Sequence, residues 1–117
     1  MIMSRKDADT TVQELRDAVR DFVYARGWSY FHDPKNLAMS IAIEAAELME
    51  HFQWTRSNAS HQEADDRRSD VEDELADVVC YVLAFANAMD IDIASSVRSK
   101  MKKNAEKYPA EQCYGKA

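Results

Sequence analysis

The chain is organised around two short acidic motifs, each within a mainly apolar helical segment: Glu44-Ala45-Ala46-Glu47 and Glu74-Leu75-Ala76-Asp77. In each motif the two carboxylates are three residues apart, so they project from the same side of a helix. The first motif lies within the mainly apolar segment 37–54, and the second leads into the uncharged run 78–89. Apolar residues fall almost all round both helices at 100° per residue, which predicts burial on several sides.

Carboxylates in such surroundings need a counter-charge, because burying an ionised group without a partner is unfavourable. Few basic residues are close enough in sequence to pair with these four acids, so a shared divalent cation is the economical explanation. A ligand set made only of carboxylates suits Mg²⁺ or Mn²⁺. A di-iron centre fits less well, because the Glu-x-x-His spacing of di-iron helical bundles is absent. The alternative is that both pairs lie on solvated helix faces, where acids at this spacing are common.

The composition predicts a single all-α domain with an ordered part at about residues 10–110. The chain has 117 residues but only two Gly and two Pro, and helix-forming residues are plentiful. Its net charge of −6 argues against nucleic acid as the main partner. Residues 98–117 carry six basic and two acidic side chains, a net charge of +4, which leaves −10 on the rest. This basic end either faces the acidic motifs across an anionic ligand or is a solvated helix end.

Local signals predict four main helices joined by short loops. Thr11-Val12-Gln13-Glu14 fits a capping box, Gly27 is a plausible helix stop, and Asp33-Pro34 reads as an N-cap followed by the first helical residue. A second possible capping box begins at Ser60, and Asp92 can cap a last helix. Residues 1–9 are expected to be a disordered lead. The helices are expected at about residues 12–26, 34–53, 60–89 and 93–107.

Two helices that are apolar almost all round are difficult to cover within so short a chain, so we expect a homo-oligomer with a hydrophobic helical interface. Cys80 and Cys113 are too few for a disulfide framework, and Cys80 is expected to be a reduced core thiol. The start of the chain turns polar at once, unlike a signal peptide. The longest apolar run is shorter than the ~20 residues of a membrane span. We therefore expect a cytoplasmic protein that does not contact a membrane.

The order and spacing of the two acidic motifs resemble those of the MazG-like all-α nucleoside triphosphate pyrophosphohydrolases. Ile43 stands where MazG itself has a second Glu and cannot bind a metal, which moves the resemblance towards the dCTP pyrophosphatase-like branch. The resemblance covers about residues 12–110. Further segments that look like this branch are Arg26–Leu37, Glu47–Trp54, Ser99–Met101, Asn104 and Lys107–Pro109.

The resemblance implies a four-helix MazG-like bundle that assembles as a homo-oligomer, with a tetramer favoured and a dimer as the alternative. Its active sites can draw residues from more than one subunit. It implies cleavage of a nucleoside triphosphate between the α- and β-phosphates, with dCTP or a modified dCTP as substrate and nucleotide-pool house-cleaning as the role. Glu47, or Glu44 in its place, is expected to activate the attacking water. The Mg²⁺ ligands of the family fall on Glu44, Glu47, Glu74 and Asp77.

Aromatic residues before and after the first motif are candidates for a base pocket, because aromatic faces stack on nucleobases and Asn or His can read a base edge. Lys100 and Asn104 share a helix face with Ile93 and are expected to contact phosphate. Core packing of the aromatics and a solvated basic face are the plain alternatives. Rival functions are a broad-specificity or damaged-nucleotide hydrolase, a non-catalytic helical nucleotide-binding oligomer and a purely structural bundle. The base-pocket candidates are Trp28, Phe31, His32, Asn36 and Trp54. Tyr81, one turn beyond Asp77, is expected near the metal, with plain packing as the alternative.

Overall fold

The computed structural model describes residues 5–116, which are helical with no strand among them. This confirms the all-α prediction. The four longest helices in this part of the chain are α1 (Val12–Ala25), α2 (Pro34–Glu50), α4 (Arg68–Met89) and α5 (Ile93–Lys107). The shorter elements are η1 (Asp7–Asp9), η2 (Ser29–Phe31), η3 (Ser57–Ala59), α3 (Ser60–Asp66) and α6 (Ala110–Cys113).

Side-chain caps begin three of the long helices at the predicted residues. Before α1, Thr11 Oγ1 accepts from the backbone N–H of Glu14 at 3.1 Å, and the Glu14 carboxylate accepts from the backbone N–H of Thr11 at 3.3 Å. Asp33 accepts from the N–H of Asn36 at 2.8 Å before α2, and Asp92 accepts from the N–H of Ser95 at 2.9 Å before α5. These bonds satisfy backbone donors that the first turn of a helix leaves free.

The single helix expected over residues 60–89 is wrong, because the structure divides it at Arg67 into α3 and α4. The second capping box does not form either: Ala59 is the N-cap residue, and Ser60 Oγ donates to the carbonyl of Ser57 at 2.8 Å. Asp and Ser are poor helix formers and are frequent around the break, which makes an interruption inexpensive. Within the predicted disordered lead, residues 7–9 form the η1 turn, and residues 1–4 lie outside the described part.

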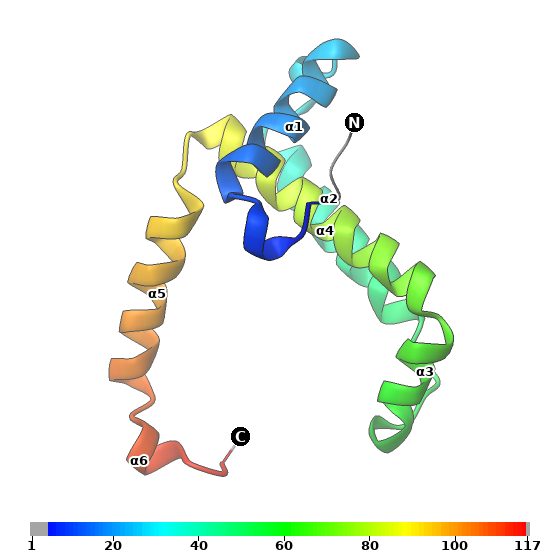
Figure 1. The fold of residues 1–117 in the computed structure, drawn as a ribbon, viewed down its shortest axis with the longest axis vertical. Helices are drawn as coiled ribbons and strands as arrows, with labels where there is room; N and C mark the ends of the chain where they lie inside the picture. Colours follow the sequence, from blue (N-terminus) through cyan, green and yellow to red (C-terminus); the bar gives the residue numbers. More distant parts are fainter. Residues whose placement is uncertain (1–4, 117) are drawn as a thin grey trace.

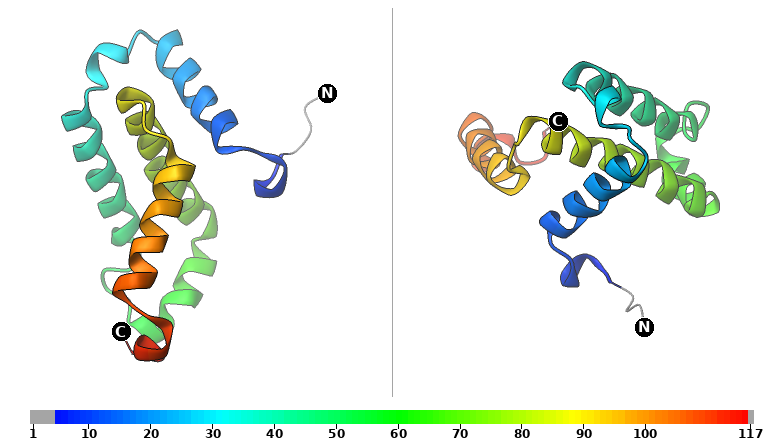
Figure 2. Two further views of the ribbon diagram at one scale, coloured as in Figure 1. Left: turned by 90° about the vertical axis from the view of Figure 1, so that its left-hand side faces the viewer. Right: turned by 90° about the horizontal axis from the view of Figure 1, so that it is seen from above.

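The fold is built on α2 and α4, which lie side by side along much of their length, with α1 packed across α4 (Figures 1 and 2). Leu37 of α2 and Leu83 of α4 are 2% and 5% exposed, and Ala84 and Ala86 complete the buried apolar core of residues 5–116. The core is small for a chain of this length.

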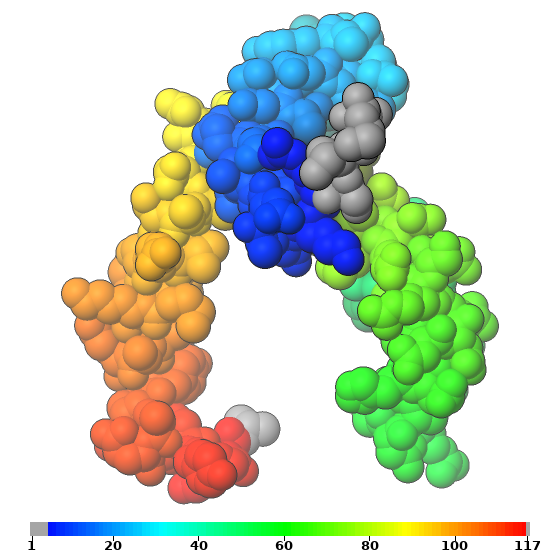
Figure 3. Space-filling view, in the orientation of Figure 1, coloured from blue at the N-terminus to red at the C-terminus, as the bar shows by residue number. Residues whose placement is uncertain are grey.

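The single chain is open rather than compact, because α5 runs away from the other long helices (Figure 1). The arm formed by α5 and α6 stays separate from the arm formed by α3 and the start of α4 in the space-filling view (Figure 3). The radius of gyration is 17.2 Å, whereas a compact domain of this length has about 13 Å. The chain exposes 9771 Å², compared with roughly 6,500 Å² for a compact monomer of its mass. Thus α5 does not complete a bundle within one chain.

Within residues 5–116, no single helix is both long and apolar enough to cross a membrane. Only α4 and α5 taken together meet that length and composition, and this pair is bent by 103° at its junction.

Candidate active site

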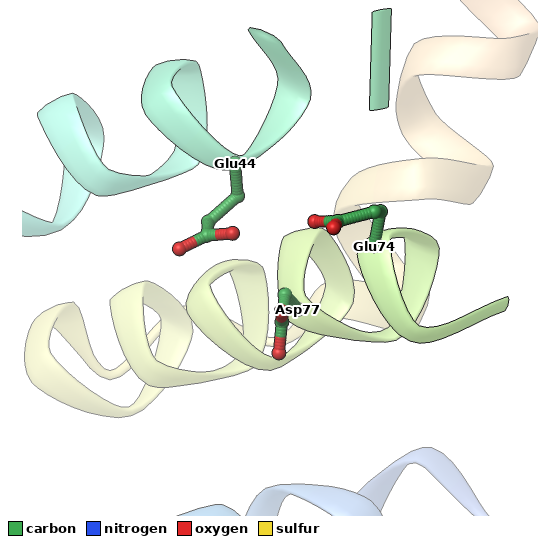
Figure 4. Close-up of side chains that lie close together, drawn as sticks. All are labelled: Glu44, Glu74 and Asp77. Carbon is green, nitrogen blue, oxygen red and sulfur yellow. The ribbon is translucent and has the colours of Figure 1, made fainter. Parts of the chain in front are cut away.

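Three of the four predicted acidic ligands meet between α2 and α4. Glu44 approaches from α2, while Glu74 and Asp77 come from successive turns of α4 (Figure 4). Each contributes one carboxylate oxygen to a group in which all such oxygens lie within 4.8 Å of one another. The spacing of three residues places Glu74 and Asp77 on one face of α4, and the pairing of the two helices brings Glu44 opposite them.

Two oxygens of this cluster are shielded from solvent and lack a hydrogen-bond partner among the described residues: Glu44 Oε2 and Glu74 Oε2. Burial raises the pKa of Glu44 above its ordinary value of 4.5, and the neighbouring carboxylates of Glu47, Asp77 and Glu74 raise it further. Burial also raises the pKa of Glu74, as do Glu47 and Asp77, while His51 acts in the opposite direction. Like charges crowded into a poorly hydrated space disfavour the ionised forms.

Glu47 is the fourth predicted acid and stands beside the group of three. It is half-buried on α2, one turn after Glu44, and its carboxylate is close enough to raise the pKa of both Glu44 and Glu74. His51 follows one turn later and is half-buried near Glu74. The four acids therefore occupy one region, with Glu47 placed differently from the other three.

The donor set fits a hard divalent cation. It consists of carboxylate oxygens, and none of the ion pairs within residues 5–116 gives Glu44, Glu47, Glu74 or Asp77 a basic partner. A buried carboxylate oxygen without a donor loses the hydration of the unfolded chain and gains nothing in return. A cation between α2 and α4 could take one oxygen from each of the three carboxylates, so the residues present fit a metal.

An apolar pocket of about 410 Å³ lies next to the acidic cluster, between α1 and α4. Trp28 and His32, two of the five predicted base-pocket residues, line it. So do Asp77 of the cluster and Tyr81, the residue expected near the metal. The volume lies in the range of small-molecule sites, which are mainly apolar with a few polar groups. Asp77 therefore belongs to both the acidic cluster and the pocket wall.

The other predicted contacts lie outside this pocket. Trp54 is 91% exposed and Phe31 is 62% exposed. The side-chain amide of Asn36 donates to the carbonyl of Phe31 and the carboxylate of Asp33 at 3.2 and 3.0 Å, so it serves the start of α2. Lys100 and Asn104 lie on α5, which diverges from the α2–α4 pair that carries the carboxylates (Figure 1).

Sequence reasoning missed much of the pocket wall. Cys80 is exposed and lines the pocket, so its assignment to the core is wrong. Burial around its sulfur and the charge of Asp77 raise the pKa of this thiol. The α4 positions could have been found by extending the face of Asp77 by three, four and seven residues, which reaches Cys80, Tyr81 and Ala84. The residues of α1 on the wall are Ala18, Val19, Phe22 and Val23.

Known proteins resemble this chain over most of its length. A model of the MazG-like family matches residues 39–116. The dCTP pyrophosphatase 1 of Mus musculus is 32% identical over 115 residues, which covers 97% of this chain and 68% of the mouse protein. The Homo sapiens protein of the same name is 36% identical over 104 residues, covering 87% of this chain and 61% of the human one. The chain thus spans about two thirds or less of these relatives.

A solved structure is similar to this chain over almost the full length of both proteins. The crystal structure of a pyrophosphatase from Archaeoglobus fulgidus superposes with a TM-score of 0.81 and 43% sequence identity, covering 93% of this chain and 99% of the archaeal one. The similarity includes all the long helices that carry the cluster and the pocket wall, because so little of either chain is left out.

Proposed function

This chain belongs to the MazG-like family as a dCTP pyrophosphatase-like hydrolase, and on that premise we propose that it is a Mg²⁺-dependent nucleoside triphosphate pyrophosphohydrolase. The reaction adds water to the α-phosphorus of a deoxynucleoside triphosphate and breaks its bond to the α–β bridging oxygen. The products are the nucleoside monophosphate and pyrophosphate. The substrate we expect is dCTP or a modified dCTP, and the role is house-cleaning of the nucleotide pool.

The observation that carries this proposal is the pair of orphaned oxygens beside an apolar pocket. Glu44 Oε2 and Glu74 Oε2 lack hydrogen-bond partners among the described residues, and Asp77 links their cluster to a pocket whose volume of about 410 Å³ can hold a nucleobase. A triphosphate lying over the cluster would extend its sugar and base towards the pocket. A purely structural bundle offers no reason to keep unsatisfied carboxylates next to an open apolar pocket.

Mg²⁺, for which Mn²⁺ could substitute, would be held by Glu44, Glu74 and Asp77 with Glu47 nearby, and when bound it supplies charge neutralisation to the phosphate oxygens. Glu47 is the residue we assign to the attacking water. It stands beside the group of three yet outside it, so its carboxylate is available to accept a proton from the water. A positioned carboxylate that accepts a proton in this way typically contributes 10²–10⁴-fold to rate. Glu44 is the alternative base.

His32 is well suited to read a base edge. Its Nδ1 lies 2.9 Å from the backbone carbonyl oxygen of Trp28. A carbonyl only accepts, so Nδ1 carries the proton and donates, and Nε2 of the neutral ring is left as an acceptor. Because His32 lines the pocket, Nε2 can accept a hydrogen bond from the exocyclic amino group of a cytosine. Trp28 on the same wall supplies an aromatic face for stacking.

The working form we propose is a homo-oligomer, with a tetramer expected before a dimer. Large apolar side chains are uncovered on several helices, and the surface exceeds that of a compact monomer by roughly 3,000 Å². This excess is of the size that an obligate interface buries. The basic face of α5 in a neighbouring subunit could then bring Lys100 and Asn104 to the triphosphate. Phe31, Asn36 and Trp54 also remain predicted base contacts, which a neighbouring subunit would complete.

The test is a panel of nucleoside triphosphates hydrolysed with Mg²⁺ in water enriched in ¹⁸O. We expect monophosphate and pyrophosphate, with the label in the monophosphate, and a preference for dCTP. Nucleoside diphosphate and orthophosphate as products would contradict the proposal. Equal turnover of all bases would favour the broad-specificity hydrolase, and label in pyrophosphate would move the attack to the β-phosphorus.

A single domain over residues 1–117 and a cytoplasmic location stay predictions.

A further inference from the structure

Arg16 of α1 is the one buried charged side chain within residues 5–116, at 9% exposure. Among these residues no carboxylate pairs with it in an ion pair. Its guanidinium binds the C-terminal end of α4 instead. Nη2 donates to the carbonyl of Ala86 at 3.1 Å, Nη1 donates to the carbonyl of Ile91 at 2.7 Å, and Nε donates to Asn87 Oδ1 at 3.0 Å. A cation at this end of a helix complements the helix dipole, and the Ala86 carbonyl accepts from the backbone N–H of Ile91 as well as from Arg16.

Asn87 returns the contact, because its side-chain Nδ2 donates to the backbone carbonyl of Arg16 at 2.9 Å. Four hydrogen bonds therefore join one residue of α1 to the segment 86–91. The planar guanidinium holds its donors in a fixed geometry, so it fixes both the position and the rotation of α1 relative to the segment 86–91. An apolar contact fixes neither. We call this set the Arg16–Asn87 lock.

The pocket that adjoins the acidic cluster also extends towards the lock, which lies at one end of it. That pocket has α1 as one wall and α4 as the other, with Val19 and Ala84 among the nearest residues to the lock along each helix. Among the long helices α1 packs mainly on α4, and its pocket residues Ala18, Val19 and Val23 offer only non-directional apolar contacts. The acidic cluster, in contrast, is held between α2 and α4, and of its three residues only Asp77 also lines the pocket that α1 helps to form.

We propose that Arg16 and Asn87 are positioning residues for the nucleotide: the lock fixes the register of α1 on α4 and thereby the width of the base pocket. It acts through Val19, Phe22 and Trp28 and does not touch the reacting phosphate. This inference rests on the proposed function, since it assigns the pocket to the base.

The experiment compares Arg16→Lys and Asn87→Ala with the wild-type protein. Lysine keeps the charge but has a single ammonium group in place of the fork, and Asn87→Ala removes two of the four bonds while the carbonyl bonds of Arg16 remain. We expect KM for the preferred nucleotide to rise about tenfold in each variant, with kcat changed by less than about twofold. The Mn²⁺ affinity of the nucleotide-free protein should stay at the wild-type value.

Arg20→Lys is the matched control, because Arg20 is an exposed arginine one turn further along α1 that pairs with Asp17 and Asp21. It should leave KM, kcat and Mn²⁺ affinity unchanged. An unchanged KM in both lock variants overturns the inference, and so does a loss of Mn²⁺ affinity in proportion to the rise in KM, since that marks general loosening. If Arg16→Lys does not fold, Asn87→Ala decides alone. Absence of wild-type turnover contradicts the proposed function itself, whereas wild-type turnover with unchanged variants contradicts only the lock.

Discussion

At the scale of single residues, the acidic cluster is defined by the crowding of carboxylates in a partly buried site. Glu44 and Glu74 each leave one oxygen without a donor, and burial raises the pKa of both. Glu47 adds a further carboxylate within electrostatic range. Such a cluster lowers the stability of the metal-free protein at neutral pH. The same crowding of carboxylates favours the binding of a cation.

The assignment of Glu47 to the water predicts the effect of Glu47→Gln. The amide cannot accept a proton, so kcat for pyrophosphate release should fall about 10²–10⁴-fold. Far-ultraviolet circular dichroism should remain that of the wild type. Glu50→Gln is the control, because Glu50 is exposed on the same helix and should retain activity. Full activity of Glu47→Gln would remove its assigned role.

The raised pKa values of Glu44 and Glu74 predict how the metal-free protein responds to pH. In the folded protein both groups have a pKa above the ordinary value of 4.5. Their contribution to the free energy of unfolding is therefore fully present below pH 4.5, and it is lost as the pH rises through the raised pKa. Glu44→Gln should therefore raise Tm by a few degrees at pH 8 in a chelator, while excess Mg²⁺ should stabilise the wild type more than the variant. A lower Tm for Glu44→Gln in chelator at pH 8 would contradict this account.

At the scale of elements, caps and stops position the residues of the pocket. α1 ends with the N–H of Gly27 donating to the carbonyl of Tyr24 at 3.1 Å and the N–H of Trp28 donating to the carbonyl of Val23 at 3.1 Å. This pattern requires a left-handed residue, and Gly27 has φ of +65°. The turn thereby places Trp28 directly on the pocket wall that α1 forms.

Gly27→Ala should lower the free energy of unfolding by about 1 kcal/mol, because an L side chain is strained at this φ. No atom lies within 4 Å of the added Cβ among the described residues, so the cost is conformational rather than steric. Gly27→Asn is the control and should be less destabilising, since Asn tolerates the left-handed region. Urea denaturation measures both variants, and equal stability of Gly27→Ala and wild type would count against the strain.

Much of the helix pattern could be predicted from sequence, because its signals are local. The caps at Thr11, Asp33 and Asp92 need only neighbouring residues, and the spacing within each acidic motif fixes which side chains share a face. The break at Arg67 and the α1 wall of the pocket were not predicted. The pocket wall depends on how α1 packs across α4, which no local spacing encodes, and Arg16 gave no signal that it would be buried.

At the scale of the whole molecule, the open shape of the chain points to association. On α4, Leu75, Val79 and Val82 follow one another at helical spacing and are 52%, 41% and 38% exposed. A single chain would leave this row of apolar side chains in water. Exposed apolar patches of this kind mark interaction surfaces. Covering them with further copies would also return the exposed area towards that of a compact protein.

Val79→Lys tests this by placing a charge in the middle of the row. Sedimentation velocity should show the wild type as an oligomer well above the 13.4 kDa of one chain, and the variant shifted towards monomer with reduced turnover. Asp70→Lys, on the exposed start of the same helix, should remain oligomeric. A monomeric wild type with full activity would contradict the proposed assembly.

The most direct test of the central claim, that carboxylates from α2 and α4 converge around a cation, is a Mn²⁺ titration followed by electron paramagnetic resonance. The wild type should bind Mn²⁺ saturably, Mg²⁺ should compete for the same site, and Glu44→Gln combined with Glu74→Gln should lose the binding while keeping its helical content. Undiminished Mn²⁺ binding by that double variant, or no saturable binding by the wild type, would contradict the claim.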